Sequence, residues 1–164
     1  MIFCALAVMR GAALASDDGA DLLRLKVDSI SKRLEPFTGL SPKIVLSDEK
    51  ELNAHVLPDR TVVITRGLLA ACASDDEIAF VIAHEIGHLK AKDYYTITPG
   101  LKSDDSASQL HEINADINAV FFTQKAGFNP NASLSILKRV ATGSNSTFMS
   151  RLNTLASFLK TLRN

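Results

Sequence analysis

Hydrophobic and polar residues follow two different periods along this chain, one helical and one extended. Residues 21–34 repeat apolar side chains at helical spacing, and we expect this helix to stop before Pro36. Three short runs predict strands: 43–46, 52–57 and 61–65. Pro58-Asp59 between the last two runs suits a turn, so these two runs predict a hairpin.

After residue 73 the pattern is helical. Ser74-Asp75-Asp76-Glu77 has the composition of a helix start, with a capping hydroxyl, three carboxylates in the first turn and a glutamate at the capping-box position. We expect this helix to run to about Lys92. Three further helices are predicted: 107–126 with Gly127 as its C-cap, 131–142 and 148–162.

The order of elements bears on the fold class. One helix, then short strands, then only helices favours an α+β fold over alternating strand–helix units. The 164 residues fit one domain, which we assign to residues 16–164. Lys and Arg number 18, as do Asp and Glu, so the charge gives no reason to expect nucleic acid as a partner. No apolar run approaches the roughly 18–20 residues that span a bilayer.

Residues 1–15 have features of a secretory signal peptide. Residues 1–9 are almost wholly apolar, and Ala13-Leu14-Ala15 has the small-x-small pattern of a cleavage site. However, the apolar stretch is brief and Arg10 follows it, so an apolar N-terminal helix or a misassigned start codon is the alternative. We expect export to the periplasm or outside the cell, or a cytoplasmic location if this leader is not cleaved.

A metal-binding pattern lies within the helix that begins near Ser74: His84-Glu85-Ile86-Gly87-His88. Two histidines at i and i+4 share one face of a helix, so both imidazoles can reach one ion. Imidazole is a good ligand for Zn²⁺. Glu85 points to the side of that face, where its carboxylate suits a general base for a zinc-activated water.

A catalytic zinc site needs a third protein ligand, and Glu112 on the next predicted helix is a candidate. Asp116 follows one turn later, where it suits a hydrogen bond from a zinc-binding histidine. We therefore predict one zinc ion per chain, held by His84, His88 and Glu112, with water in the fourth position. Solvated or hydrogen-bonded histidines are the alternative, but burying these groups in an apolar helix favours a bound cation.

Four nearby residues have simpler interpretations. We expect Gly87 to let a strand or a substrate backbone approach the helix, the alternative being a tolerated helical glycine. His111 points elsewhere on its helix than Glu112, so we interpret it as a non-ligand. His55 is expected to be a solvated or core-edge histidine, and Cys72, in an apolar run, a small buried hydrophobe.

Three stretches, in this order, resemble the M48 family of zinc metallopeptidases, within the gluzincin group. They are residues 53–68, which include the lead-in Thr65-Arg66-Gly67-Leu68, then His84-Glu85-Ile86-Gly87-His88, and then Glu112-Ile113-Asn114-Ala115-Asp116. The resemblance spans roughly residues 20–160. It implies a compact zincin-like fold, mostly helical, with a small β-sheet over the active-site helix, in a soluble member without transmembrane helices.

The resemblance also implies substrate-binding residues. Asn53 and Ala54, on the edge strand, are expected to bind the backbone of an extended peptide, as in strand addition; for Asn53, a polar residue that only opens a strand is the alternative. Family members often carry a His-Pro pair six residues before an arginine that supports the histidine. Arg151 matches that arginine, unless it is an ordinary surface or helix-pairing residue. The pair reads Asn145-Ser146 here, and Asn145 keeps a hydrogen-bond donor without the charge.

These observations favour a zinc endopeptidase that hydrolyses peptide bonds in extended or unfolded protein segments, with Glu85 as general base. The missing His-Pro pair keeps open a second hypothesis, a zinc-bound peptide-binding or chaperone-like module with little turnover. A structural zinc domain fits less well, because structural sites usually fill the fourth position with Cys or His.

Overall fold

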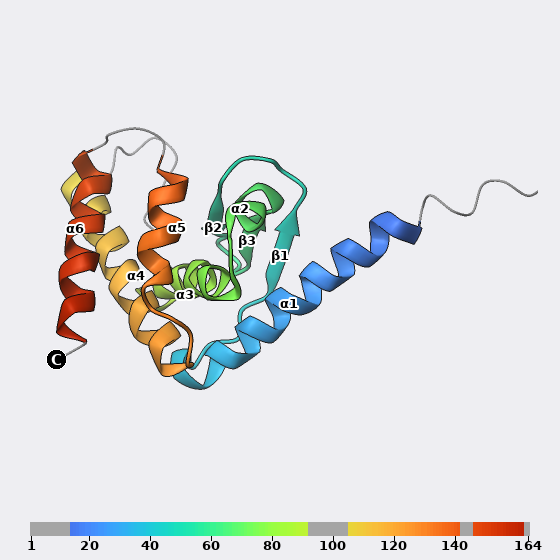
Figure 1. Ribbon diagram of the computed structural model, residues 1–164, viewed down its shortest axis with the longest axis horizontal. Coiled ribbons are helices and arrows are strands. Elements are labelled where there is room, and N and C mark those ends of the chain that lie inside the picture. The colour runs from blue at the N-terminus through green and yellow to red at the C-terminus, as the bar shows by residue number, and fades with distance from the viewer. Residues whose placement is uncertain (1–13, 92–104, 142–145, 163–164) are drawn as a thin grey trace, which may run out of the picture.

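The computed structural model describes residues 14–91, 105–141 and 146–162. Two predictions fall on residues outside these ranges: most of the leader at 1–15, and the substrate contact of Asn145. The elements within the ranges are α1 (Leu14–Thr38), β1 (Ile44–Ser47), β2 (Ala54–Val56), β3 (Val62–Thr65), α2 (Arg66–Ala71), α3 (Asp75–Ala91), α4 (Asp105–Lys125), α5 (Ala132–Val140) and α6 (Ser146–Thr161) (Figure 1). This mostly helical chain with a small sheet confirms the predicted α+β fold.

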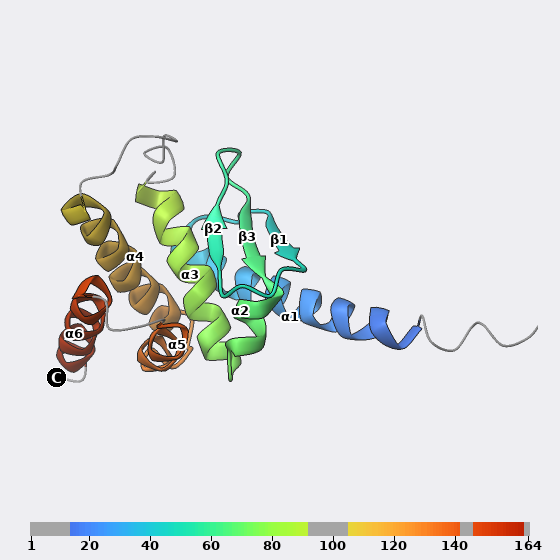
Figure 2. The same cartoon turned by 90° about the horizontal axis from the view of Figure 1, so that it is seen from above.

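The sheet has the strand order β1-β3-β2. β2 pairs antiparallel with β3, which confirms the predicted hairpin, and β1 pairs parallel with β3, which the sequence pattern did not indicate. Figure 2 shows β2 as the strand nearest α3, with β1 on the far side of the sheet. β2 is therefore an edge strand that lies beside helix α3.

Helix α3 lies at the centre of the domain and is buried on almost every side. Helices α1, α4 and α5 and strand β2 all contact it, and 11 of its 17 residues are buried. Its weak amphipathic pattern follows from this placement, because a helix surrounded by protein carries apolar residues all round. The core joins α3 to one face of α1 and to the sheet, through Val27, Ile30, Leu34, Ile44, Val62, Ile64, Ile82 and Ile86 among others.

The prediction that the first helix stops before Pro36 is wrong. α1 runs to Thr38 with Pro36 inside it. Proline removes one N–H donor and disfavours helix at the preceding residue, but Pro36 stands in the last turn, where few helical hydrogen bonds remain to be lost. Gly39, with φ of 68°, then ends the helix by donating its N–H to Glu35 O at 2.8 Å.

Helix α2 was not predicted, because its six residues lie in an apolar run too short to show a period. Cys72 is the C-cap of this helix. It packs against the core, as expected of a small hydrophobe, but it is half-buried where the sequence predicted a buried residue. Burial still raises the pKa of the Cys72 thiol to about 12.

Among the residues described, no helix combines the length and apolarity that crossing a bilayer demands.

Candidate metal centre

Ser74 caps the start of α3 as the sequence predicts, whereas Glu77 accepts from the residue before the cap. Ser74 Oγ accepts a hydrogen bond from Glu77 N at 3.3 Å, and Glu77 Oε2 accepts one from Ala73 N at 2.6 Å. Glu77 also forms an ion pair with Arg139 of α5. These contacts hold the helix that carries His84, Glu85 and His88 in place.

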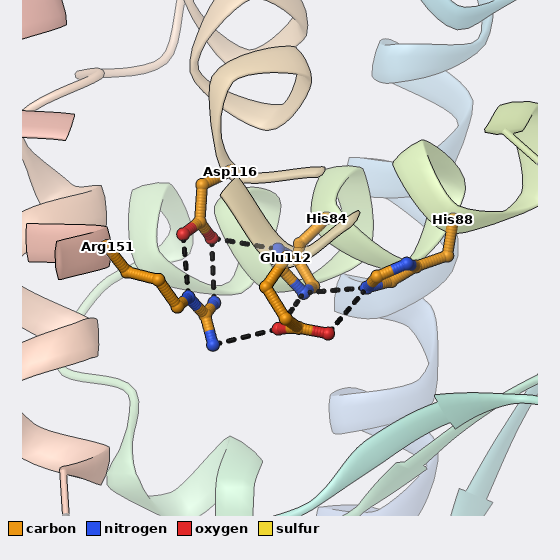
Figure 3. A network of polar contacts seen from close by, with 5 residues as sticks. All are labelled: His84, His88, Glu112, Asp116 and Arg151. Carbon is orange, nitrogen blue, oxygen red and sulfur yellow. Dashed lines mark hydrogen bonds and ion pairs between the residues drawn. The ribbon is translucent and has the colours of Figure 1, made fainter. Parts of the chain in front are cut away.

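Close packing of α4 on α3 brings the two halves of the site together. A Cβ atom on Gly87 would lie 3.1 Å from Ala115 Cα, a tighter contact than most side chains tolerate. The element that approaches Gly87 is therefore helix α4, so the expectation of a strand or a substrate backbone at this point is wrong. Ala115 lies between Glu112 and Asp116, so this approach brings both carboxylates to the imidazoles (Figure 3).

Three side chains, those of His84, His88 and Glu112, converge on one point. The Nε2 atoms of His84 and His88 lie 3.1 Å apart. Glu112 Oε2 lies 3.5 Å from His84 Nε2, and Glu112 Oε1 lies 3.3 Å from His88 Nε2. Within the described ranges, these three residues form the group whose geometry suits a metal ion.

The donor set fits zinc. Tetrahedral zinc with bonds of about 2.0–2.1 Å places its ligand atoms about 3.3–3.4 Å from one another, close to the three separations observed. Two imidazole nitrogens and one carboxylate are the ligands that catalytic zinc sites use when one position stays open. His84, His88 and Glu112 are therefore the residues that would hold the ion.

Asp116 and Arg151 contact the metal-binding side chains. Asp116 Oδ1 lies 3.0 Å from His84 Nδ1, although off the line of an ideal hydrogen bond. Arg151 of α6 donates to Asp116 Oδ2 through Nε and to Oδ1 through Nη2, both at 2.8 Å. Its Nη1 lies 2.8 Å from Glu112 Oε2. Arg151 thus binds both carboxylates of α4 at once, as Figure 3 shows.

The carboxylates of the site favour a positive charge at the His84 imidazole. Burial alone would lower the pKa of His84, but Asp116 and Glu112 raise it to about 10. Burial alone would raise the pKa of Asp116, but the Arg151 guanidinium and His84 hold it below its usual range. With the imidazoles neutral, as metal ligands must be, Glu85, Glu112 and Asp116 lie near one guanidinium, a formal excess of two negative charges that a divalent cation would balance.

A cavity of about 320 Å³ opens beside these groups. We call it the site cavity. Its polar end is formed by His84, Glu85, Glu112 and Arg151. The remaining lining is Leu52, Asn53, Ala54, Leu68, Phe80, Val81, Ile136, Leu137, Val140, Ala141 and Phe148. Asn53, Ala54 and Arg151, singled out through the resemblance, therefore lie at the same cavity as the metal-binding residues.

Glu85 is buried, and its carboxylate lines the site cavity. Burial raises the pKa of Glu85, partly offset by the nearby His84 and His88. A carboxylate with a raised pKa at the wall of a cavity is suited to accept a proton.

Comparison with known proteins shows the family to which the chain belongs. Residues 23–103 match the sequence profile of Peptidase family M48, about half of the chain. The chain belongs to peptidase family M48. Two curated relatives are both named mitochondrial metalloendopeptidase OMA1. The protein from Arabidopsis thaliana is 28% identical over 127 residues, which cover 62% of this chain and 26% of the relative. The protein from Saccharomyces cerevisiae is 30% identical over 115 residues, 54% of this chain and 33% of the relative.

This M48 chain thus spans between a quarter and a third of those relatives. The helices and small sheet described above agree with the zincin-like fold of the family. The other two histidines lie apart from the metal-binding group: His55 is exposed on β2, and His111 is half-buried on α4.

Sequence reasoning missed two features of the M48 site. It did not indicate that Arg151 contacts Glu112 and Asp116, which lie 35 or more positions away, nor that α5 supplies much of the apolar lining. No pattern in the sequence near Arg151 could have predicted these contacts. The amphipathic period of 131–142 could have indicated that this helix buries one face, but not against which cavity.

Proposed function

We propose that this chain is a zinc-dependent endopeptidase that cleaves extended or unfolded segments of protein. The observation that carries the proposal is the convergence of His84 Nε2, His88 Nε2 and Glu112 within 3.1–3.5 Å of one another, beside a cavity that Glu85 lines. Membership of family M48 and similarity to two metalloendopeptidases support the reaction class.

The chemistry follows from the positions of these side chains. Zinc at this site would supply Lewis-acid chemistry, lowering the pKa of a water toward about 7 and polarising the peptide carbonyl. The Glu85 carboxylate accepts a proton from the attacking water as the water oxygen bonds to the carbonyl carbon. Glu85 then gives that proton to the amide nitrogen as the C–N bond breaks, so the products are an amine and a carboxylic acid, which loses the second proton of the water to solvent.

The edge of β2 suits the backbone of an extended peptide. Asn53 O accepts from Thr65 N at 3.0 Å, and Leu57 N donates to Thr61 O at 2.8 Å. Backbone groups in an antiparallel pair alternate in direction, so those of Ala54 and Val56 point away from β3. A peptide strand that pairs with this edge would lie along the site cavity, which Ala54 lines.

The apolar lining favours substrates with large apolar side chains. Away from its polar end, the site cavity is lined mostly by aliphatic and aromatic residues from α2, α3, α5 and α6. Such side chains are buried in folded proteins and become accessible when a segment unfolds. This supports unfolded protein, rather than a native surface, as the substrate class.

A cleavage assay with zinc-loaded wild-type protein tests the proposal. We expect cleavage of a casein-type unfolded protein, its loss on chelation and its return when zinc is restored. A tightly folded protein serves as the resistant control. If the zinc-loaded chain binds unfolded peptide but does not cut it, the second hypothesis of a peptide-binding module replaces this one. The Asn145-Ser146 departure from the family's His-Pro pair is the feature that favours that alternative.

A further inference from the structure

The Thr65-Arg66-Gly67-Leu68 stretch belongs to the family resemblance, but the chemistry above gives it no role. In the structure it forms the corner between β3 and α2. Thr65 is 0% exposed. Its Oγ1 accepts hydrogen bonds from Leu68 N and from Asn53 N, both at 3.2 Å, and donates to Glu51 O at 2.5 Å. Asn53 O, at 2.9 Å, is a second acceptor for the same proton, so one hydroxyl joins backbone groups of Glu51, Asn53 and Leu68.

Gly67 also contacts the segment that joins β1 to β2. Its N–H donates to Glu49 O at 3.0 Å. A Cβ atom at this position would lie 2.0 Å from Lys50 O, a backbone atom that has no flexible end to move aside. The chain between β1 and β2 therefore lies directly on the first turn of α2.

These contacts position two walls of the site cavity. Asn53 and Leu68 both line the cavity, and Thr65 Oγ1 is bonded to the backbone of each. Asn53 immediately precedes Ala54, whose backbone groups point to the open edge of β2. Within the part of the chain that the structure describes, the hydroxyl of Thr65 bonds to the residues that lead into β2 and to the first turn of α2, and to none of the metal-binding residues.

We propose that Thr65 is a positioning residue that fixes the open edge of β2 at the site cavity, so that its hydroxyl determines how tightly an extended peptide binds. The inference rests on the proposed function, because it takes that edge as the substrate's binding surface. Misplacing this edge would weaken the main-chain hydrogen bonds that hold an extended peptide, while the metal-binding residues and Glu85 stay unchanged.

Three variants test this. Thr65→Val removes the hydroxyl at nearly constant volume, Thr65→Ser keeps it, and Thr123→Val is the matched control. Thr123 is 1% exposed, and its hydroxyl donates only within α4, to Ala119 O and Val120 O. Each change is made in wild type and in a Glu85→Gln background. The Glu85→Gln proteins allow equilibrium binding of an extended apolar peptide to be measured without turnover.

We expect Thr65→Val to weaken peptide binding about tenfold, the equivalent of one hydrogen bond. In the cleavage assay KM rises, while kcat, zinc content and inhibition by acetohydroxamate, too small to reach β2, stay near wild type. Thr65→Ser and Thr123→Val should bind peptide as wild type does. If Thr65→Val does not fold, Thr65→Cys, with its weaker donor, takes its place with the same expected direction.

Other results overturn the proposal. Equal weakening by Thr65→Val and Thr123→Val, or a fall in zinc content and kcat that follows the loss of stability, would make Thr65 merely structural. Failure of the proposed function looks different: wild type would not cleave, whereas the comparison of peptide binding among the Glu85→Gln proteins would still stand.

Discussion

Helix α3 buries two glutamates eight residues apart, and their surroundings differ. Glu77 is 3% exposed and Glu85 is 6% exposed. Glu77 accepts a hydrogen bond from Ala73 N and pairs with Arg139, which also donates to Ala71 O at 2.9 Å. Within the described ranges, Glu85 has no hydrogen bond or ion pair, and it faces the site cavity.

The difference separates a structural carboxylate from a chemical one. Burying a carboxylate is costly unless something compensates its charge. For Glu77 the protein supplies that compensation, and the result ties the start of α3 to α2 and α5. For Glu85 compensation depends on what enters the cavity, which is how a group that exchanges protons with substrate should be placed.

The largest expected effect is that of Glu85→Gln. Without a base at this position, kcat should fall by about a hundredfold to ten-thousandfold, while zinc content is retained. Stability should hold or rise, because a neutral amide replaces a buried carboxylate. Cleavage rates, metal analysis and thermal unfolding check this, with Glu77→Gln as the matched control that keeps kcat. A Glu85→Gln protein with more than a tenth of wild-type kcat would contradict the assignment.

The two arginines extend the comparison. Arg151→Met should weaken zinc binding by about ten- to a hundredfold, because Glu112 and Asp116 lose the guanidinium that orients them. Arg139→Met should leave zinc binding unchanged, because its partner Glu77 lies away from the metal-binding group. Competition against a chelator of known affinity measures both. Equal losses in the two variants would remove the distinction between structural and site carboxylates.

Glu77→Gln should act on stability instead. We expect a loss of about 1–3 kcal/mol in the free energy of unfolding. The value lies below that for a fully buried pair, because the Arg139 side chain is 40% exposed and regains hydration. Urea unfolding measures it. No change in stability would mean that the Glu77–Arg139 pair does not anchor α3.

The smallest effect concerns the packing that joins the two ligand-bearing helices. Gly87→Ala should lower kcat/KM by roughly two- to tenfold, since Ala115 must shift and Glu112 moves with it. Gly19→Ala is the control: a Cβ there meets nothing within 4 Å, so up to about 1 kcal/mol of added stability is expected. Gly87→Ala activity equal to wild type would show that the close approach is not needed.

Local spacing explains how much of the site could be predicted. His84 and His88 share a helix face, as do Glu112 and Asp116, so each pair followed from the chain itself. That the two pairs meet depends on α3–α4 packing, for which Gly87 was a signal assigned to the wrong neighbour. The Arg151 contacts depend on how α6 packs on α4, and no short-range pattern records that.

In the fold, too, features set by neighbouring residues were predicted, and features set by distant packing were not. The β2–β3 hairpin has a short turn and was predicted, whereas the parallel pairing of β1 needs a crossover that no local signal specifies. The prediction that α1 ends before Pro36 was wrong because proline disfavours helix only locally, in the last turn. The packing of Val27, Ile30 and Leu34 against the core stabilises the helix more than this preference opposes it.

The most direct test of the zinc site is X-ray absorption at the zinc edge, together with metal analysis, on the purified chain. We expect one zinc per chain with two imidazoles and oxygen ligands at about 2.0–2.2 Å, lost when His88 is changed to Ala. A shell of sulfur at about 2.3 Å, or zinc retained at the same stoichiometry in His88→Ala, would contradict a site formed by His84, His88 and Glu112.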